Sequence, residues 1–518
     1  MSGLWAFYFF AKLYFFYRGY MSFTPMLNLL LLLAIIVPLP MAWGSSMFVA
    51  FLRGLALFVA GFLLLWRDSF LPSLSTSLSF VTNASTAPSK TYMMDFAHRY
   101  YNPREFAVLL ALLVACIWVR RKGVRLTPLL LPLIFLATIS GIASRHGASG
   151  DRIDTFYAQE AKRAVRFEAP PAGAPAFDIL LIQICSLGWD DLDAAGLRNH
   201  PFWKNFDYLF TNYNGATSYS NPAAHRLLHA PCGQLAHEDL YRDIPKECYL
   251  LDELRRVGFR TYAAYDHDGV YGHFAEEAIK LDHADPAMPL DGLPAVEHNF
   301  EGTPIYDPYA VLEKWWRLRQ ADGAPRVALF YNATLLHDGA HFVKDKEWWN
   351  RDRVDRYHEA VLLLFADVQR FLDLLAASGR PVVVVFVPEH GMGLRGSRMQ
   401  AAGLRDIPLP PLTMIPVAIK VINGGASAAA GSPRIIDAQV SHLALAEMLA
   451  AFIRQPSLRA ADSSVLLSTL PRTPHVAENT GWKVAEFDGK FFLSGKDVRW
   501  TLLAPDAVAV PSPRWLPR

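Results

Sequence analysis

Cysteine, charged side chains and sequence repeats are all scarce in this chain. Four of its 518 residues are cysteine and 19% are charged. Neither an internal repeat nor a long low-complexity tract is present, so the chain is not an array of short units. No CxxC or HExxH spacing occurs, which excludes a metal site that a single local motif could identify. Hydrophobic residues, by contrast, make up 52% of the chain, and they gather near the N-terminus.

Five apolar stretches occupy the first 146 residues. Most of them approach the ~20 residues that a helix needs to cross a bilayer, and a cleaved signal peptide would account only for the first. Buried helices of a soluble protein are the alternative interpretation. We predict a membrane domain over residues 1–146 with about five transmembrane helices, at about residues 4–17, 27–43, 47–66, 106–119 and 127–143.

Basic residues indicate the orientation of these helices. The short connection between the last two stretches contains Arg120, Arg121, Lys122 and Arg125. Short loops rich in Lys and Arg stay in the cytoplasm, so the last helix leads outward and the chain after residue 146 is extracytoplasmic. The loop over residues 67–104 is then also outside. Its aromatic, basic end lies either on the lipid surface or in solvent.

Charge is distributed unevenly between the two parts of the chain. Residues 1–146 carry 12 Lys and Arg against 3 Asp and Glu, whereas the remainder carries 38 against 45. An acidic exported domain on a basic membrane anchor argues against nucleic-acid partners.

The cysteines provide an independent indication of the compartment. Cys116 lies in a predicted span, and a bridge between Cys232 and Cys248 would close a loop of about 15 residues, worth ~3 kcal/mol. An oxidising compartment favours such a bridge. Cys185 is then left over, and it is either a buried inert thiol or a reactive or metal-bound one.

Residues 147–176 are predicted to be a linker, and residues 177–518 an exported α/β domain. Strands alternate with helices there, which is typical of a mostly parallel sheet covered by helices. Strands are predicted at about 177–184, 209–213, 258–265, 326–331 and 382–387. Helices are predicted from about 222 and at 309–319, 353–378 and 437–453, with a hairpin over 482–493 that turns at Asp488-Gly489.

Three of the predicted strands lead directly into residues with candidate chemistry. Strand 177–184 leads into Cys185, strand 326–331 into Asn332, His337, Asp338 and His341, and strand 382–387 into Glu389 and His390. Active sites of open α/β sheets lie where strands end at their carboxyl side. A thiolate beside nitrogen and oxygen donors suits Zn²⁺ better than Mg²⁺ or Ca²⁺. The alternative for the Glu-His pair and the loop histidines is solvated side chains.

Two further residues are candidates for phosphate chemistry. Ser220 lies two residues before Pro222, a residue favoured in the first helical turn, so Ser220 is predicted at or next to a helix N-cap. It is either a simple cap or a nucleophile whose hydroxyl faces free backbone N–H groups that suit a phosphate. Arg405 is either a surface salt-bridge residue or a bidentate phosphate clamp.

With these residues placed, the chain resembles the bacterial cellulose phosphoethanolamine transferases, inner-membrane members of the alkaline phosphatase superfamily. The resemblance covers nearly the whole chain. It is densest in QICSLGWDD (183–191), ATSYSNPAAHRLL (216–228), CGQ (232–234), LLHDGAH (335–341), VPEHG (387–391) and RMQAAGLRDIP (398–408).

The resemblance implies one zinc held by Cys185, Ser220, Glu389 and His390, with Ser220 as the nucleophile that carries phosphoethanolamine. It implies that His337 and Arg405 hold the phosphate or transfer protons, and it is compatible with a disulfide between Cys232 and Cys248. The implied donor is phosphatidylethanolamine, the acceptor is the glucose 6-hydroxyl of nascent cellulose, and the partner is the cellulose synthase complex of the inner membrane, with catalysis in the periplasm. The alternatives are transfer to lipid A or another glycan, a phosphatase, and an inactive scaffold for polysaccharide secretion.

Overall fold

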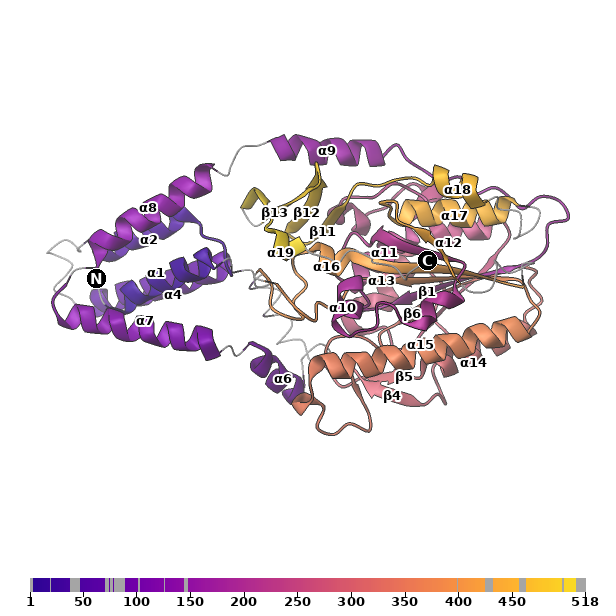
Figure 1. The fold of residues 1–518 in the computed structure, drawn as a ribbon, viewed down its shortest axis with the longest axis horizontal. Helices are drawn as coiled ribbons and strands as arrows, with labels where there is room; N and C mark the ends of the chain where they lie inside the picture. Colours follow the sequence, from indigo (N-terminus) through magenta and orange to yellow (C-terminus); the bar gives the residue numbers. More distant parts are fainter. Residues whose placement is uncertain are drawn as a thin grey trace.

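A computed structural model shows a group of N-terminal helices beside a larger α/β part (Figure 1). It describes residues 3–18, 20–37, 47–69, 74, 78, 89–100, 103–124, 126–143, 148–397, 399–423, 432–455, 463–495 and 498–508.

Each of the five predicted apolar stretches forms a helix where the structure describes it. These are α1 (Gly3–Tyr17), α2 (Pro25–Ile36), α4 (Met47–Asp68), α7 (Pro103–Arg121) and α8 (Thr127–Ala143). Within the described ranges, α4 alone is both long and apolar enough to cross a membrane, while α2 and residues 127–136 are apolar but shorter. Residues 38–43 of the second stretch, and Arg125, lie outside the described residues. The number of spans therefore stays a prediction.

The N-terminal helices bury polar side chains and expose apolar ones. Phe51 and Phe58 of α4 are 65% and 67% exposed, whereas Lys12 Nζ lies in the interior, 2.5 Å from Asp68 Oδ2 and 2.8 Å from Asn28 Oδ1. Large exposed apolar surfaces indicate contact with lipid or another protein. This distribution is the opposite of the one expected for buried helices of a soluble protein.

A further helix, α6 (Lys90–Tyr100), lies between the N-terminal helices and the α/β part (Figure 1). It forms in the loop predicted over residues 67–104 and contacts the α/β part through Tyr92 and Asp95. The side chains of residues 96–100, and residues 101 and 102, lie outside the described part of the chain, so the position of the aromatic, basic segment stays a prediction.

A seven-stranded sheet forms the centre of the α/β part, in the order β10-β2-β9-β8-β1-β6-β3. Strand β9 runs antiparallel to both neighbours, and the other pairings are parallel. This confirms the predicted mostly parallel sheet. The strands are β1 (Asp178–Ile184), β2 (Tyr208–Asn214), β3 (Arg260–Tyr265), β6 (Val327–Ala333), β8 (Val382–Pro388), β9 (Met414–Ile422) and β10 (Arg434–Ile436).

Helices cover both faces of this sheet (Figure 1). Ile179 and Leu181 of β1 pack in one buried apolar cluster, and Leu180 and Ile182 in the other. This alternation follows from the period of two along a strand. The first face is covered by α11 (Ser220–Leu228), α12 (Leu250–Arg256), α13 (Phe274–Asp282) and α17 (His442–Arg454), the second by α14 (Pro308–Ala321) and α15 (Arg353–Ala377).

Strand β9 was not predicted from the sequence, although it lies inside the sheet. Its sequence contains Pro416, and strands that contain proline normally lie at the edge of a sheet. Here Pro416 falls where the pairing with β2 shifts register between Phe210 and Tyr213, and beyond the last pair with β8. The missing N–H therefore removes no bond of the ladder.

Two smaller sheets lie beside the central one. The first contains β11 (Val476–Asn479), β12 (Trp482–Phe487), β13 (Lys490–Gly495) and β14 (Val498–Leu502), and the second contains β4 (Ala295–His298), β5 (Pro304–Tyr306) and β7 (His341–Phe342). The predicted hairpin turn is present at Asp488-Gly489, both with positive φ. Short helices complete the fold: α10 (Trp189–Ala194), α16 (Pro410–Thr413), α18 (Ser463–Thr469) and α19 (Pro505–Val508).

The segment predicted as a linker contains helix α9 (Ala148–Glu160). Its side chains Ile153 and Phe156 pack against Ala485 and Phe487 of the four-stranded sheet. This helix is therefore folded against the α/β part.

Cys232 and Cys248 form a disulfide across a sequence separation of 16 residues. Replacing both by serine is expected to destabilise the α/β part by about 3 kcal/mol, because the closed loop no longer restricts the unfolded chain. Thermal unfolding of the full chain in detergent would measure the change. Reductant should lower the wild-type midpoint to that of the variant and leave the variant unchanged; a variant as stable as the oxidised wild type would contradict the expectation.

Candidate metal and nucleophile site

Parallel pairing brings the three predicted strand exits side by side. β1 pairs with β8 up to Ile184↔Pro388, and with β6 up to Ile184↔Ala333. The carboxyl ends of these three strands therefore share one edge of the sheet, where ligands bind in open α/β folds. Cys185 follows β1 directly, and Glu389 and His390 follow β8.

The structure brings the four predicted metal residues together. Cys185, Glu389 and His390 are buried, and each offers a ligand atom within 4.8 Å of the other two. The Oγ of Ser220 lies 3.6 Å from Cys185 Sγ and 3.5 Å from His390 Nε2. These four side chains come from the end of β1, the start of α11 and the end of β8. No short sequence motif can therefore identify the site.

These four residues are called the cluster below. Without a bound cation, burial favours the neutral forms of its titratable side chains. Burial, and then the charge of Glu389, raise the pKa of the Cys185 thiol to about 12. Burial also raises the pKa of Glu389, and burial with the nearby Arg405 lowers the pKa of His390. A bound cation would reverse the penalty on the two acidic groups.

One atom of Glu389 fits such a cation in particular. Glu389 Oε2 is buried, makes no hydrogen bond within the described residues and lies 3.6 Å from His390 Nε2. A buried carboxylate oxygen without a partner is costly. Together with a thiolate and an imidazole, this oxygen completes a donor set suited to zinc.

Hydrogen bonds behind the cluster fix the orientation of its ligands. His390 Nδ1 lies 2.9 Å from the carbonyl of Gly391, so its Nε2 is the nitrogen available to the cluster. Glu389 Oε1 accepts a bond of 2.7 Å from Asn332 Nδ2, which also bonds Gln183 Oε1 at 3.0 Å. Sequence reasoning gave Gln183 no role, although a polar side chain inside an apolar strand was a usable signal.

Ser220 opens helix α11 without capping it. The N-cap residue is Tyr219, and Ser220 Oγ instead faces Cys185 and His390. The free N–H groups of the first helical turn lie beside this hydroxyl, an arrangement that favours an anionic group. The structure thus favours the second interpretation of Ser220 over the simple cap.

A residue of the four-stranded sheet holds the loop that leads to Ser220. Asn479 Oδ1 accepts bonds from Thr217 Oγ1 at 2.8 Å and from Ser218 N at 3.2 Å. Its Nδ2 donates to the carbonyl of Arg405 at 2.9 Å, and Ser218 Oγ donates to the same carbonyl at 2.6 Å. Asn479 therefore ties the Ser220 loop to the Arg405 loop, a role that no local pattern indicated.

Arg405 reaches the edge of the cluster. Its Nη1 lies 3.1 Å from Ser186 Oγ and 3.4 Å from the ring nitrogens of His390. Within the described residues, Arg405 forms no salt bridge with a carboxylate. The guanidinium is thus placed to bind an anion beside Ser220, and the surface salt-bridge interpretation is not supported.

His337 lies near these groups but does not join the cluster. Its Nδ1 lies 3.1 Å from the carbonyl of Asp338, and its ring stacks on Phe300 with centroids 5.3 Å apart. Burial, and then the charge of Arg405, lower its pKa to about 3. The imidazole of His337 is therefore neutral at physiological pH. The ring of His341 stacks instead on Trp348, with centroids 4.5 Å apart.

A tight turn follows the Glu389-His390 pair. A Cβ on Gly391 would lie 2.7 Å from Asp191 Oδ2 and 2.9 Å from the carbonyl of Pro411. Asp191 accepts bonds from the backbone N–H groups of Met392 and Leu394 at 2.6 and 2.8 Å. This turn needs glycine because the clamping carboxylate approaches the backbone so closely.

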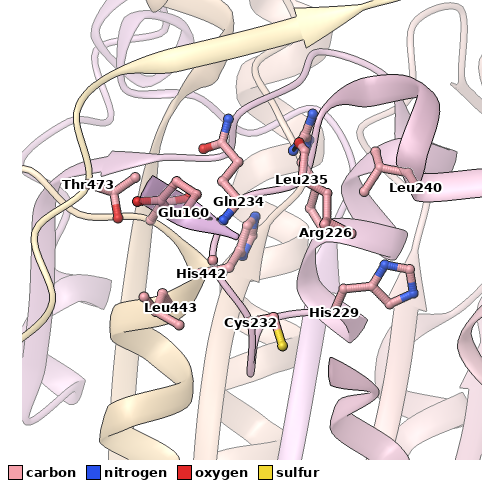
Figure 2. A pocket seen from close by; sticks show the side chains of 12 residues that line it. Glu160, Arg226, His229, Cys232, Gln234, Leu235, Leu240, His442, Leu443 and Thr473 are labelled. Atoms are coloured by element: carbon pink, nitrogen blue, oxygen red, sulfur yellow. Dashed lines mark hydrogen bonds between the residues drawn. The ribbon is translucent and has the colours of Figure 1, made fainter. Parts of the chain in front are cut away.

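A pocket separate from this cluster lies beside α11 (Figure 2). Its lining includes Arg226, His229, Cys232, Gln234 and His442. None of the four cluster residues lines it, so it is distinct from the candidate site.

Comparisons with known proteins agree over nearly the whole chain. Family models match the N-terminal domain of cellulose biosynthesis protein BcsG over residues 5–139 and its C-terminal domain over residues 142–500. The BcsG proteins of Salmonella typhimurium and Escherichia coli are each 34% identical, over 96% of this chain and 95% of their own length.

Solved structures of similar shape are more distant. The C-terminal periplasmic domain of EptC from Escherichia coli, in complex with Zn, is 14% identical with a TM-score of 0.45, covering 67% of this chain and 98% of its own. The lipooligosaccharide phosphoethanolamine transferase EptA from Neisseria meningitidis is 14% identical with a TM-score of 0.42, covering 87% and 99%.

Proposed function

The chain belongs to the cellulose biosynthesis protein BcsG family, and from that premise we propose that it transfers phosphoethanolamine from phosphatidylethanolamine to the glucose 6-hydroxyl of nascent cellulose. The observation that carries the proposal is the position of Ser220. Its hydroxyl lies at a helix N-terminus, 3.6 Å from Cys185 Sγ and 3.5 Å from His390 Nε2. A nucleophile beside metal-capable groups and an anion-binding helix end suits phosphoryl transfer.

The transfer proceeds in two displacements at phosphorus. Ser220 Oγ loses its proton and bonds to phosphorus, while the bond to the diacylglycerol oxygen breaks and that oxygen takes up a proton. The glucose 6-oxygen then attacks and loses its proton, and Ser220 Oγ leaves and regains one. Arg405 and the N–H groups of α11 offset the charge on the phosphoryl oxygens during both steps.

Zinc is the cofactor that the cluster suits, with Cys185, Ser220, Glu389 and His390 as its proposed ligands. When bound, zinc would lower the pKa of the Ser220 hydroxyl and stabilise charge on the phosphoryl group. The proposed roles of Cys185, Glu389 and His390 are to hold the ion and to exclude water around it.

We also propose an inner-membrane location, with residues 1–146 as a multi-pass membrane domain, 147–176 as a linker whose helix α9 packs on the α/β part, and 177–518 as a periplasmic catalytic domain beside the cellulose synthase complex. The exposed apolar side chains of α4 support a lipid environment,. The Cys232–Cys248 disulfide suits an oxidising compartment,.

Intact-mass analysis of the full chain with phosphatidylethanolamine tests the proposal. One added phosphoethanolamine group, located on Ser220 and discharged by cello-oligosaccharides, is the expected result. Discharge by lipid A but not by cello-oligosaccharides would refute the acceptor. A chain that transfers the group without ever carrying it would refute the covalent intermediate.

Asn332→Ala is expected to weaken zinc binding by about 10–100-fold, because Glu389 loses the amide that orients it. Competition with a chromogenic chelator would measure the affinity. Asn212→Ala provides the control, since the Nδ2 of that residue donates to the carbonyl of Asp437 at 3.2 Å in an exposed position. Equal zinc affinity in the Asn332 variant and the control would contradict this role.

A further inference from the structure

Helix α6 places one of its side chains on the loop that carries His337. Tyr92 Oη lies 3.4 Å from Asp338 Oδ2. The helix belongs to the N-terminal region of the chain, between α4 and α7, and lies between that region and the α/β part (Figure 1). The contact therefore joins segments that are 246 residues apart.

The Tyr92 ring lies directly on the backbone of Gly339. A Cβ built on Gly339 would come within 2.5 Å of the ring and 2.8 Å of Phe300 Cβ. Gly339 also has a φ of +81°, which side-chain-bearing residues rarely adopt,. Glycine is therefore required there for two reasons, and one of them is the approach of Tyr92.

Aromatic contacts extend from Tyr92 to the imidazole of His337. The rings of Tyr92 and Phe300 are 5.3 Å apart, and Phe300 stacks on His337 at 5.3 Å with an interplanar angle of 25°. The backbone N–H of Ser89 donates to the carbonyl of Phe300 at 3.0 Å. A shift of α6 would thus be transmitted to His337 through packed rings.

Two largely buried ion pairs hold the same surface together. Asp338 Oδ1 pairs with Arg353 at 3.2 Å, and Asp95 of α6 pairs with Arg356 at 3.1 Å. All four side chains are less than 15% exposed. Breaking a pair of this kind leaves a buried charge without a partner, which costs free energy. The two pairs therefore hold α6 in one position on the α/β part.

We propose that Tyr92 is a positioning residue of the transferase site, holding the His337–Gly339 loop from the N-terminal region of the chain. This inference rests on the proposed function for its catalytic consequence. It means that residues outside 177–518 complete the site. A loosened loop would displace His337 from the Arg405 side of the site, and small displacements of catalytic groups cost rate.

The pH profile provides a readout that a purely structural role would not shift. His337 is faced by Arg405 and His267, which lower its pKa, by Asp338, which raises it, and by the ring of Tyr271, 6.2 Å away. Removing the Tyr92 ring admits water and raises this pKa from about 3 towards its usual 6.5,. The neutral imidazole is then lost at higher pH than in the wild type, so the acid limb of kcat moves upward.

Full-length Tyr92→Ala, Tyr92→Phe and Met94→Ala proteins in phosphatidylethanolamine vesicles test the inference. Met94 lies on the same helix and is 51% exposed. Tyr92→Ala should lower kcat about tenfold with little change in KM and speed hydrogen exchange of the 334–340 amides. Tyr92→Phe, which keeps the ring, should lose much less, and Met94→Ala should behave as wild type.

Wild-type kcat and exchange in Tyr92→Ala would overturn the inference. Equal losses in Tyr92→Ala and Met94→Ala, with lowered thermal midpoints, would also overturn it, since any damage to α6 would then suffice. Faster exchange in Tyr92→Ala alone, in a protein without transferase activity, would support the positioning contact and refute the proposed function instead.

Discussion

Ser220→Ala is expected to lower transfer by about 10⁴-fold or more, because no oxygen remains to take the phosphoryl group. Diacylglycerol release from phosphatidylethanolamine by the full chain would measure the loss, and intact mass should show no adduct. The neighbouring fold should be unaffected, since the Ser220 hydroxyl interacts with Cys185, His390 and Glu389, which all belong to the cluster itself.

Ser220→Thr is the matched control because it keeps a hydroxyl at the same position. It should retain measurable transfer and the adduct, at a reduced rate set by the extra methyl group in a partly buried site. Near wild-type turnover by Ser220→Ala would remove Ser220 from the reaction and leave the cluster as a metal site without this nucleophile.

Glu389→Gln is expected to reduce zinc from about one ion per chain to a small fraction, with affinity falling about 100-fold or more. The substitution keeps the shape and the bond to Asn332 but removes the charge that offsets the cation. Elemental analysis of the purified full chain would measure the zinc. Transfer activity should fall in parallel and return in part with excess zinc.

Glu297→Gln provides the control for this experiment. Glu297 of β4 is also buried, and burial raises its pKa well above the usual value, which favours the neutral carboxyl group. Replacing it by an amide changes little electrostatically and should leave the zinc content unchanged. Full zinc occupancy in Glu389→Gln would refute the assignment of that carboxylate as a ligand.

The candidate site depends on support from three other parts of the chain. Asn332 on β6 orients Glu389, Asn479 on β11 holds the loops of Ser220 and Arg405, and Tyr92 on α6 contacts the His337 loop. A fragment limited to the central sheet and its covering helices would keep the cluster residues and Asn332. It would lose the contacts that hold the nucleophile and the arginine in register.

Sequence reasoning located the groups at strand ends because that signal is local. A run such as 382–387 predicts a buried strand from its own composition, and the polar residues that follow it must lie at the sheet edge. Strand β9 was missed because Pro416 argues locally against a strand, and only the register shift in the folded sheet removes that objection. Asn479 was missed for a related reason, since nothing near it in sequence concerns the site.

The sequence by itself determined the family, the alternation of strands and helices, the apolar N-terminal region and the identity of the candidate ligands. Only the tertiary structure decided that Cys185, Glu389 and His390 lie within 4.8 Å of one another and that Ser220 meets them. Local patterns specify each element, but the order β8-β1-β6 joins segments about 200 and about 150 residues apart in sequence,. The same holds for Tyr92, whose place against Gly339 depends on how the N-terminal region packs against the α/β part.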